Sequence, residues 1–187
     1  ERAGVQGHAR ACDHALDASG AERLVYLDGI DDLGYEAAEA GAHEPADDED
    51  NDREGQPVSI AVLRRTLEIN LVGTIDFTER MLSSLFDGAH IVSLGSGWGS
   101  LTEERSSDAP AYSISKAGLS MYTRRLAARL IPRKITVSIL SPGWTQTDMG
   151  GREATRVVSE PASEIYTLAT SHVPSGRFWE RGKERSW

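Results

Sequence analysis

The chain has 187 residues, of which 20 are Lys or Arg and 29 are Asp or Glu, and its net charge is −9. This length suits one domain, residues 1–187, and the acidic balance disfavours binding to nucleic acid or to anionic membrane surfaces. The single cysteine, Cys12, excludes an intrachain disulfide, and no apolar run approaches the roughly 18 residues of a membrane helix, so we expect a cytoplasmic protein.

The first third of the chain combines two predicted elements with an acidic segment. A helix is predicted over residues 5–18, where Gly20 ends it, and a short apolar strand over residues 24–27. Residues 41–55 contain seven acidic side chains and almost nothing apolar, which predicts a surface loop. Because this loop lacks the ligand spacing and central glycine of a calcium-binding loop, we expect no metal site.

Two long helices are predicted in the middle of the chain. After Ser59, apolar residues recur every three or four positions and form one stripe: Ile60, Leu63, Leu67, Leu71 and Ile75. Asn70 lies beside this stripe, where a buried amide would need hydrogen-bond partners. The second helix carries Tyr112 and continues to Leu130, because Pro132 cannot extend it.

Two buried strands are each followed by a short polar motif. Residues 89–94 lead into Gly95-Ser96-Gly97, and residues 135–140 lead into Ser141-Pro142-Gly143. A last helix over residues 160–169 precedes a strand over residues 176–179. Alternating strands and helices predict an α/β domain with a parallel sheet, and ligands bind such sheets at the carboxyl ends of the strands.

The pair Tyr112 and Lys116 is the main chemical signal. Residues four apart project from the same face of a helix, so the ammonium would lie near the phenol. A nearby cation favours the phenolate and lowers a tyrosine pKa from about 10 towards neutral pH. Tyr112 is therefore a candidate general acid and base.

Two other chemistries fit the sequence less well. Ser96 at a strand end suggests acyl transfer, but a nucleophile elbow needs glycine two positions earlier, where this chain has Leu94. The glycines at 95, 97 and 99 imitate a dinucleotide loop, but the polar residues 101–108 begin no helix. We interpret this segment as a turn.

Four motifs together resemble the short-chain dehydrogenase/reductase family, in order and approximate spacing, from about residue 20 to Trp187. They are Asn70 with Gly73, Ser96 in Gly-Ser-Gly, Tyr112-Ser-Ile-Ser-Lys116, and Pro142-Gly143 followed by Thr147-Asp-Met. The tail that begins at Pro174 is similar to the carbonyl-reductase-like branch of the family. The resemblance implies a three-layer Rossmann-like domain.

The resemblance also implies a reaction, namely hydride transfer between NAD(P)(H) and a small carbonyl or alcohol substrate. Tyr112 would transfer the proton, Ser96 would bind the reacting oxygen, Lys116 would assist Tyr112, and Asn70 would anchor a water in the proton path. The residues implied to contact the cofactor are Tyr112, Lys116, Pro142, Gly143, Thr145 and Thr147. The branch favours NADP over NAD, and the two long helices would form a homodimer or homotetramer.

The family's glycine-rich first βαβ unit has no counterpart before Tyr112. We interpret residues 24–28 as the family's fourth strand, with Leu27-Asp28-Gly29 where the family usually has Asn-Ala-Gly. Taking them as the second strand would leave about thirty residues for two strands and two helices, which is too few. We therefore expect an N-terminally truncated fold that binds NAD(P) weakly. The alternative function is a remnant of the fold that acts as a structural or interaction subunit.

Overall fold

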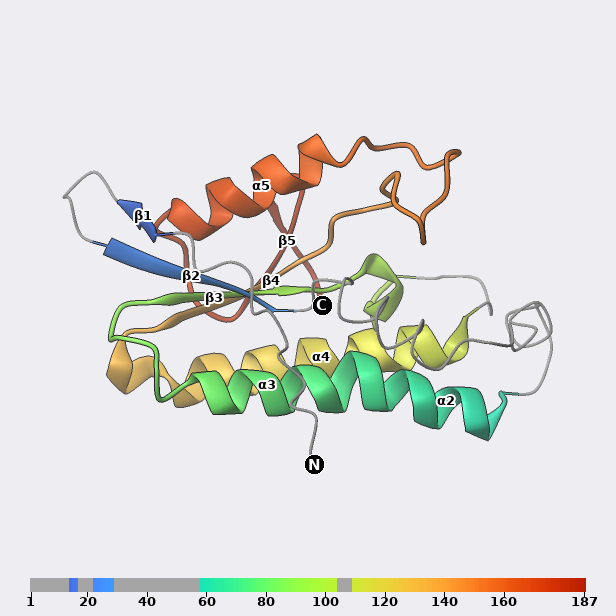
Figure 1. The fold of residues 1–187 in the computed structure, drawn as a ribbon, viewed down its shortest axis with the longest axis horizontal. Helices are drawn as coiled ribbons and strands as arrows, with labels where there is room; N and C mark the ends of the chain where they lie inside the picture. Colours follow the sequence, from blue (N-terminus) through green and yellow to red (C-terminus); the bar gives the residue numbers. More distant parts are fainter. Residues whose placement is uncertain (1–13, 17–21, 29–57, 104–108) are drawn as a thin grey trace, which may run out of the picture.

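The computed structural model describes residues 14–16, 22–28, 58–103 and 109–187, and these form a three-layer α/β domain (Figure 1). Helices α2, α3 and α4 cover one face of a central sheet, and α5 covers the other. The sheet has six strands in the order β1-β2-β3-β4-β5-β6. The Rossmann-like α/β architecture predicted from the sequence is confirmed.

The strands of the sheet are β1 (His14–Leu16), β2 (Glu22–Asp28), β3 (His90–Leu94), β4 (Thr136–Leu140), β5 (Arg177–Glu180) and β6 (Lys183–Arg185). The four strands β2 to β5 are parallel, whereas β1 and β6 pair antiparallel at the two ends. Because helices cover both faces, β3 and β4 are almost entirely buried, which explains their apolar sequences.

The helical layer on one face begins with a long three-part helix. Helix α2 (Ile60–Leu67) starts at Ser59, whose Oγ accepts a hydrogen bond from the Val62 amide at 3.4 Å. A π-helical segment, η2 (Glu68–Gly73), follows without a break and leads into α3 (Thr74–Met81). The amphipathic helix predicted after Ser59 is confirmed, but its π-helical centre was not predicted.

Two further helices complete the layers. Helix α4 (Pro110–Arg129) starts with proline in its first turn and gives way to a 3-10 turn, η4 (Ile131–Arg133), at Pro132. Helix α5 (Ser159–Thr170) crosses the opposite face. Both helices were predicted within a few residues.

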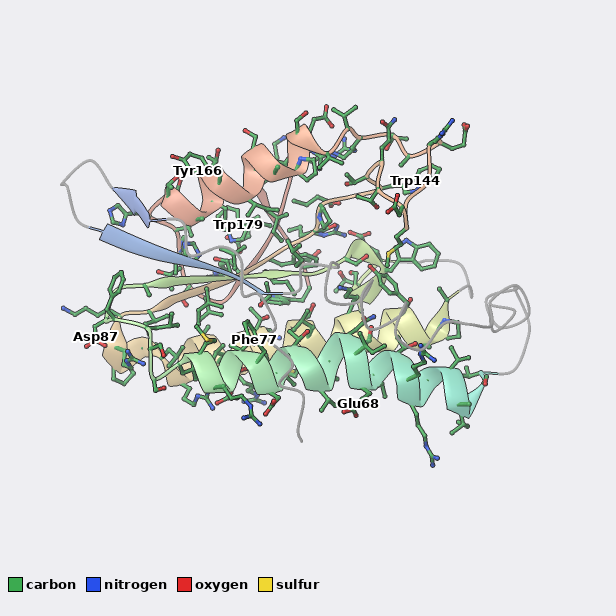
Figure 2. The ribbon with its side chains drawn as sticks, in the orientation of Figure 1. Glu68, Phe77, Asp87, Trp144, Tyr166 and Trp179 are labelled. Atoms are coloured by element: carbon green, nitrogen blue, oxygen red, sulfur yellow. The ribbon has the colours of Figure 1, made fainter. Side chains whose placement is uncertain are left out.

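The core divides between the two faces of the sheet. Ile91 and Val137, which are paired in register, pack on the α4 side together with Leu126 of that helix. Val92 and Leu140 point to the opposite side and pack against Leu168. Figure 2 shows the same division, with Phe77 between α3 and the sheet and Trp179 between the sheet and α5. This alternation is the two-residue period of a strand buried on both faces.

The position of β2 supports its interpretation as the family's fourth strand. It lies directly beside β3 and parallel to it, with Asp28 opposite Ser93. In a doubly wound sheet of order 3-2-1-4-5-6, the fourth strand has this neighbour and the second strand does not. The acidic segment 41–55 and Cys12 lie outside the described residues.

One sequence-based prediction was wrong and one element was missed. Residues 14–16 belong to β1 and not to the helix predicted over residues 5–18, the rest of which is outside the described residues. His14 pairs with Leu24, so β1 covers backbone groups at the edge of β2 that a helix would leave unpaired. Strand β6, which pairs with β5 through a tight turn, was not predicted.

Candidate active site

The first component of the site is the turn that follows β3. Ser96 caps a single 3-10 turn, η3 (Gly97–Gly99), and its Oγ accepts a hydrogen bond from the Trp98 amide at 3.2 Å. The ladder to β4 continues just past the strand, because the Gly95 amide donates to the Leu140 carbonyl at 2.8 Å. The half-buried Ser96 hydroxyl therefore lies at the carboxyl edge of the sheet, as predicted.

Helix α4 brings Tyr112 and Lys116 to this edge. Lys116 is only 6% exposed, and its Nζ donates a hydrogen bond to the carbonyl of Leu94, the last residue of β3, at 3.2 Å. The same Nζ lies 5.5 Å from the centre of the Tyr112 ring. A largely buried ammonium is costly unless it has partners, and here the partners include a strand-end carbonyl and an aromatic ring. Tyr112 itself is half-buried.

Gly99 lets the Ser96 turn lie directly on α4. A Cβ atom at this position would come within 2.7 Å of the Ala117 nitrogen and of the Lys116 carbonyl carbon. These are backbone atoms of a helix and cannot rotate away. The close approach at Gly99 therefore sets the distance between the turn that carries Ser96 and the helical turn that carries Lys116.

Asn70 joins the site from the π-helical segment. Its Nδ2 donates to Ser115 Oγ at 3.3 Å, and Ser115 Oγ donates to the Tyr112 carbonyl at 2.7 Å. The amide beside the apolar stripe thus has the partner that its position demands. π-helical turns inside α-helices are frequent at functional sites, because they displace backbone groups from the regular hydrogen-bond ladder.

The second predicted motif follows β4 at the same edge of the sheet. Gly143 has φ of +71°, a conformation that favours glycine, and its amide donates to Ser141 Oγ at 3.3 Å. The buried Thr145 hydroxyl turns back to the carbonyls of Pro142 and Gly143, at 3.2 Å each. The Thr145 side chain thus stabilises the loop from within. Contacts of Thr145 with groups outside the loop are left to its backbone.

The remainder of this loop extends beyond the sheet. Thr147 is exposed, and its Oγ1 accepts a hydrogen bond from the Gly150 amide at 3.1 Å. Trp144 is 54% exposed and donates from its indole to the Gly150 carbonyl at 2.8 Å. Figure 2 shows Trp144 on this loop, away from the helices of the opposite layer.

Arg156 holds the loop in place, although the sequence did not predict this role. Its side chain is 7% exposed, and it donates to the Pro142 carbonyl at 2.7 Å and to the carboxylates of Glu160 and Glu164. The hydrogen bond to Glu164 is the main reason that the pKa of Arg156 lies above its usual value. The glutamates stand four and eight residues after Arg156, which would have been the only signal in the sequence.

The structure therefore assembles the predicted residues in two groups at one edge of the sheet. Asn70, Tyr112 and Lys116 are linked through α4, with the Ser96 turn packed against the same helix. Pro142, Gly143, Thr145 and Thr147 form the neighbouring loop. Among the described residues, no cluster of three or more His, Cys, Asp or Glu side chains could hold a metal ion, and no helix is long and apolar enough to cross a membrane.

Comparison with known proteins gives the family. The sequence model described as "short chain dehydrogenase" matches residues 8–157. The C-signal protein of Myxococcus xanthus is 36% identical over 135 residues, which cover 70% of this chain and 81% of that protein. Carbonyl reductase family member 4 of Xenopus tropicalis is 33% identical over 118 residues, or 62% of this chain. The matched part spans only 44% of that reductase.

Solved structures agree on the fold. A short-chain dehydrogenase/reductase from Burkholderia multivorans with bound NADP superposes with a TM-score of 0.66 at 21% identity. The superposition covers 74% of this chain and 61% of the Burkholderia chain. The family predicted from four short motifs is confirmed. The chain belongs to the short-chain dehydrogenase family.

Proposed function

We propose that the protein catalyses reversible hydride transfer between NAD(P)(H) and a small carbonyl or alcohol substrate, at a site formed by Ser96, Tyr112, Lys116 and Asn70. The observation that carries this proposal is the placement of Lys116. An ammonium that is 6% exposed lies against the Tyr112 ring and is held by the end of β3. A fortuitous surface pair would leave the lysine in water, which stabilises an ammonium well.

The described residues fit the nicotinamide end of the cofactor. Gly143 has a left-handed backbone that favours glycine, so the loop presents main-chain groups there, and its Cβ side is packed against the Arg156 Cδ, which a Cβ would approach to 3.1 Å. The Lys116 ammonium is the group suited to ribose hydroxyls. We assign the backbone of Pro142, Gly143 and Thr145, with the Thr147 hydroxyl, to the nicotinamide half. When bound, the nicotinamide supplies or accepts the hydride.

The side chains of the site transfer the proton and stabilise the charge that develops during the reaction. In reduction, the Tyr112 hydroxyl gives its proton to the carbonyl oxygen, so the product is an alcohol and the tyrosine is left as a phenolate. The Lys116 ammonium stabilises that phenolate, because opposite charges attract strongly where water is scarce. The Ser96 hydroxyl donates a hydrogen bond to the same substrate oxygen. Asn70 holds the water through which the proton is replaced.

The test compares two tyrosines of one helix. Tyr112→Phe removes the proton-bearing oxygen and should reduce carbonyl turnover by about a hundredfold or more. Tyr122→Phe is the matched control, because Tyr122 lies in α4 and its hydroxyl donates to Glu79 at 2.8 Å, away from the site. The control should keep near wild-type turnover. If Tyr112→Phe kept more than about a tenth of the activity, its catalytic role would be refuted.

A second candidate function is an interaction protein that uses the fold without a dinucleotide. It is favoured by one comparison: the relative matched over 81% of its length is named as a signal and not as a reductase. Calorimetric titration with NADPH and with NADH separates the two candidates. Micromolar binding of either supports the enzyme and overturns the weak binding expected from the sequence, whereas no binding by a folded chain supports the interaction protein. Cytoplasmic location and a homodimer or homotetramer stay predictions.

A further inference from the structure

The two loops of the proposed site are connected by a third segment, residues 180–187, which we call the C-terminal brace. It contains the end of β5, the turn, β6 and the last two residues. One loop, residues 95–103, leaves β3 and carries Ser96. The other, residues 141–147, leaves β4 and carries Gly143. The brace contacts both loops, and its hydrogen bonds to the first loop join residues 82 to 87 positions apart in the sequence.

The brace holds the Ser96 loop at its far end. The main-chain oxygen of Trp187 accepts hydrogen bonds from Ser100 Oγ at 3.3 Å and from Thr102 Oγ1 at 2.8 Å. Arg185 adds an ion pair to Glu103. The Trp187 ring is itself fixed, because its centre lies 5.8 Å from that of the buried Phe178 ring.

The same arginine reaches the second loop through two intermediates. Arg185 forms another ion pair with Glu180, and the other oxygen of Glu180 accepts a hydrogen bond from Ser141 Oγ at 3.1 Å. Ser141 Oγ in turn accepts the Gly143 amide at 3.3 Å. Arg185 therefore stands between one carboxylate that belongs to the Ser96 loop and another that holds the Gly143 loop.

The surroundings of Arg185 restrict which other side chains could form both ion pairs at this position. Its side chain is 11% exposed, and its guanidinium lies 5.0 Å from the centre of the Phe178 ring. A planar guanidinium offers separate N–H groups to two carboxylates, whereas a lysine ammonium is a single point charge. Without any cation here, two carboxylates would share a partly dry site and repel each other.

We propose that Arg185 is a positioning residue that fixes the separation of the two loops and thereby the place of Ser96 relative to the Gly143 backbone. The loops hold the reacting oxygen and the nicotinamide, respectively, if the proposed function is correct. An ordered bridge keeps both in the reactive arrangement, and errors of about 1 Å in such arrangements can cost a hundredfold in rate.

The first experiment measures the loops directly and needs no activity. Backbone hydrogen exchange of the free protein is compared for Arg185→Met and for the control Arg177→Met. Arg177 forms an exposed ion pair with Glu184 across the same two strands, at 3.2 Å, and that pair touches neither loop. We expect exchange to accelerate about tenfold or more in residues 96–102 and 143–147 of Arg185→Met, and to stay unchanged in the control. Unchanged exchange in both loops would overturn the proposal.

A conservative variant covers the case in which Arg185→Met does not fold. Arg185→Lys keeps the charge but cannot donate to both carboxylates in the same way, so exchange should accelerate in at least one loop while the rest of the chain stays protected. If Arg185→Lys exchanged like the wild type in both loops, the bridge would have no positioning role.

The second experiment links the bridge to catalysis. Carbonyl turnover per folded molecule should fall about tenfold or more in Arg185→Met, recover partly in Arg185→Lys and stay unchanged in Arg177→Met. A wild-type protein without turnover would refute the proposed function, while the exchange experiment would still decide the role of Arg185. An active wild type with an equally active Arg185→Met would refute the positioning role alone.

Discussion

Gly99→Ala tests whether the close approach between the Ser96 turn and α4 builds the site. The added Cβ would lie 2.7 Å from the Ala117 nitrogen and from the Lys116 carbonyl carbon, whereas ordinary contact begins at 3.4 Å. The turn and the helix must therefore separate by the difference, about 0.7 Å. Because both partners are helical backbone, no side-chain rotation can absorb this movement.

The movement has two consequences, which give the expected losses of stability and of turnover in Gly99→Ala. Overpacking a tight contact costs about 1–3 kcal/mol of unfolding free energy. The movement also shifts Ser96 relative to Tyr112 and Lys116, and a displacement approaching 1 Å can reduce turnover by about a hundredfold. We therefore expect a 10- to 100-fold loss of carbonyl turnover with a moderate loss of stability.

Chemical denaturation and steady-state reduction with NADPH measure the two effects on the same preparations. Gly118→Ala is the control in the neighbouring turn of α4. There the added Cβ would meet the Leu71 Cδ2 at 2.7 Å, the far end of a side chain that can rotate, and the helix gains up to about 1 kcal/mol in propensity. Wild-type stability and turnover in Gly99→Ala would refute the reasoning.

Two more predictions concern ion pairs. Arg156→Met leaves the carboxylate of Glu164 without its cation and should lower the unfolding free energy by about 3 kcal/mol in urea denaturation. Arg80→Met breaks an exposed i,i+4 pair and should leave the unfolding free energy nearly unchanged, so equal losses in the two variants would contradict this reasoning. The hydrogen bond from Arg129 holds the pKa of Glu79 below its usual range, so this pair contributes stability above about pH 4.3 and loses it as the pH falls through the lowered pKa. Glu79→Gln should therefore melt below the wild type at pH 7 and close to it in strong acid, and a difference that did not change with pH would contradict the assignment.

Local signals in the sequence predicted much of the fold and of the site. The apolar stripe after Ser59 and the stop at Pro132 indicated two long helices, because helical periodicity and the missing proline N–H act over a few residues. The strand motifs placed Ser96 and Pro142-Gly143 at the same edge of the sheet, since parallel strands end together. The proximity of Tyr112 and Lys116 could likewise be predicted from local sequence, because residues four apart project from the same face of a helix.

Other features depended on partners that are far apart in the chain. The helix expected over residues 5–18 was wrong at β1, because pairing with β2 outweighs local preference. Strand β6 was missed because its short polar sequence shows no alternation, and only the neighbouring β5 makes it a strand. The π-helical segment around Asn70 likewise carries no pattern that a helical period would detect.

The family and the layered α/β architecture could be predicted from the amino-acid sequence alone, and so could candidate residues for the site, because these predictions use periodicity and short motifs in a set order. Three features became visible only in the folded chain: Lys116 is buried against β3, Gly99 lets the Ser96 turn contact α4, and Arg156 and Arg185 form ion pairs that hold the two loops. Those contacts join residues up to 82 positions apart. Their energies come from burial and from charge pairing, which exist only after the sheet has brought the segments together.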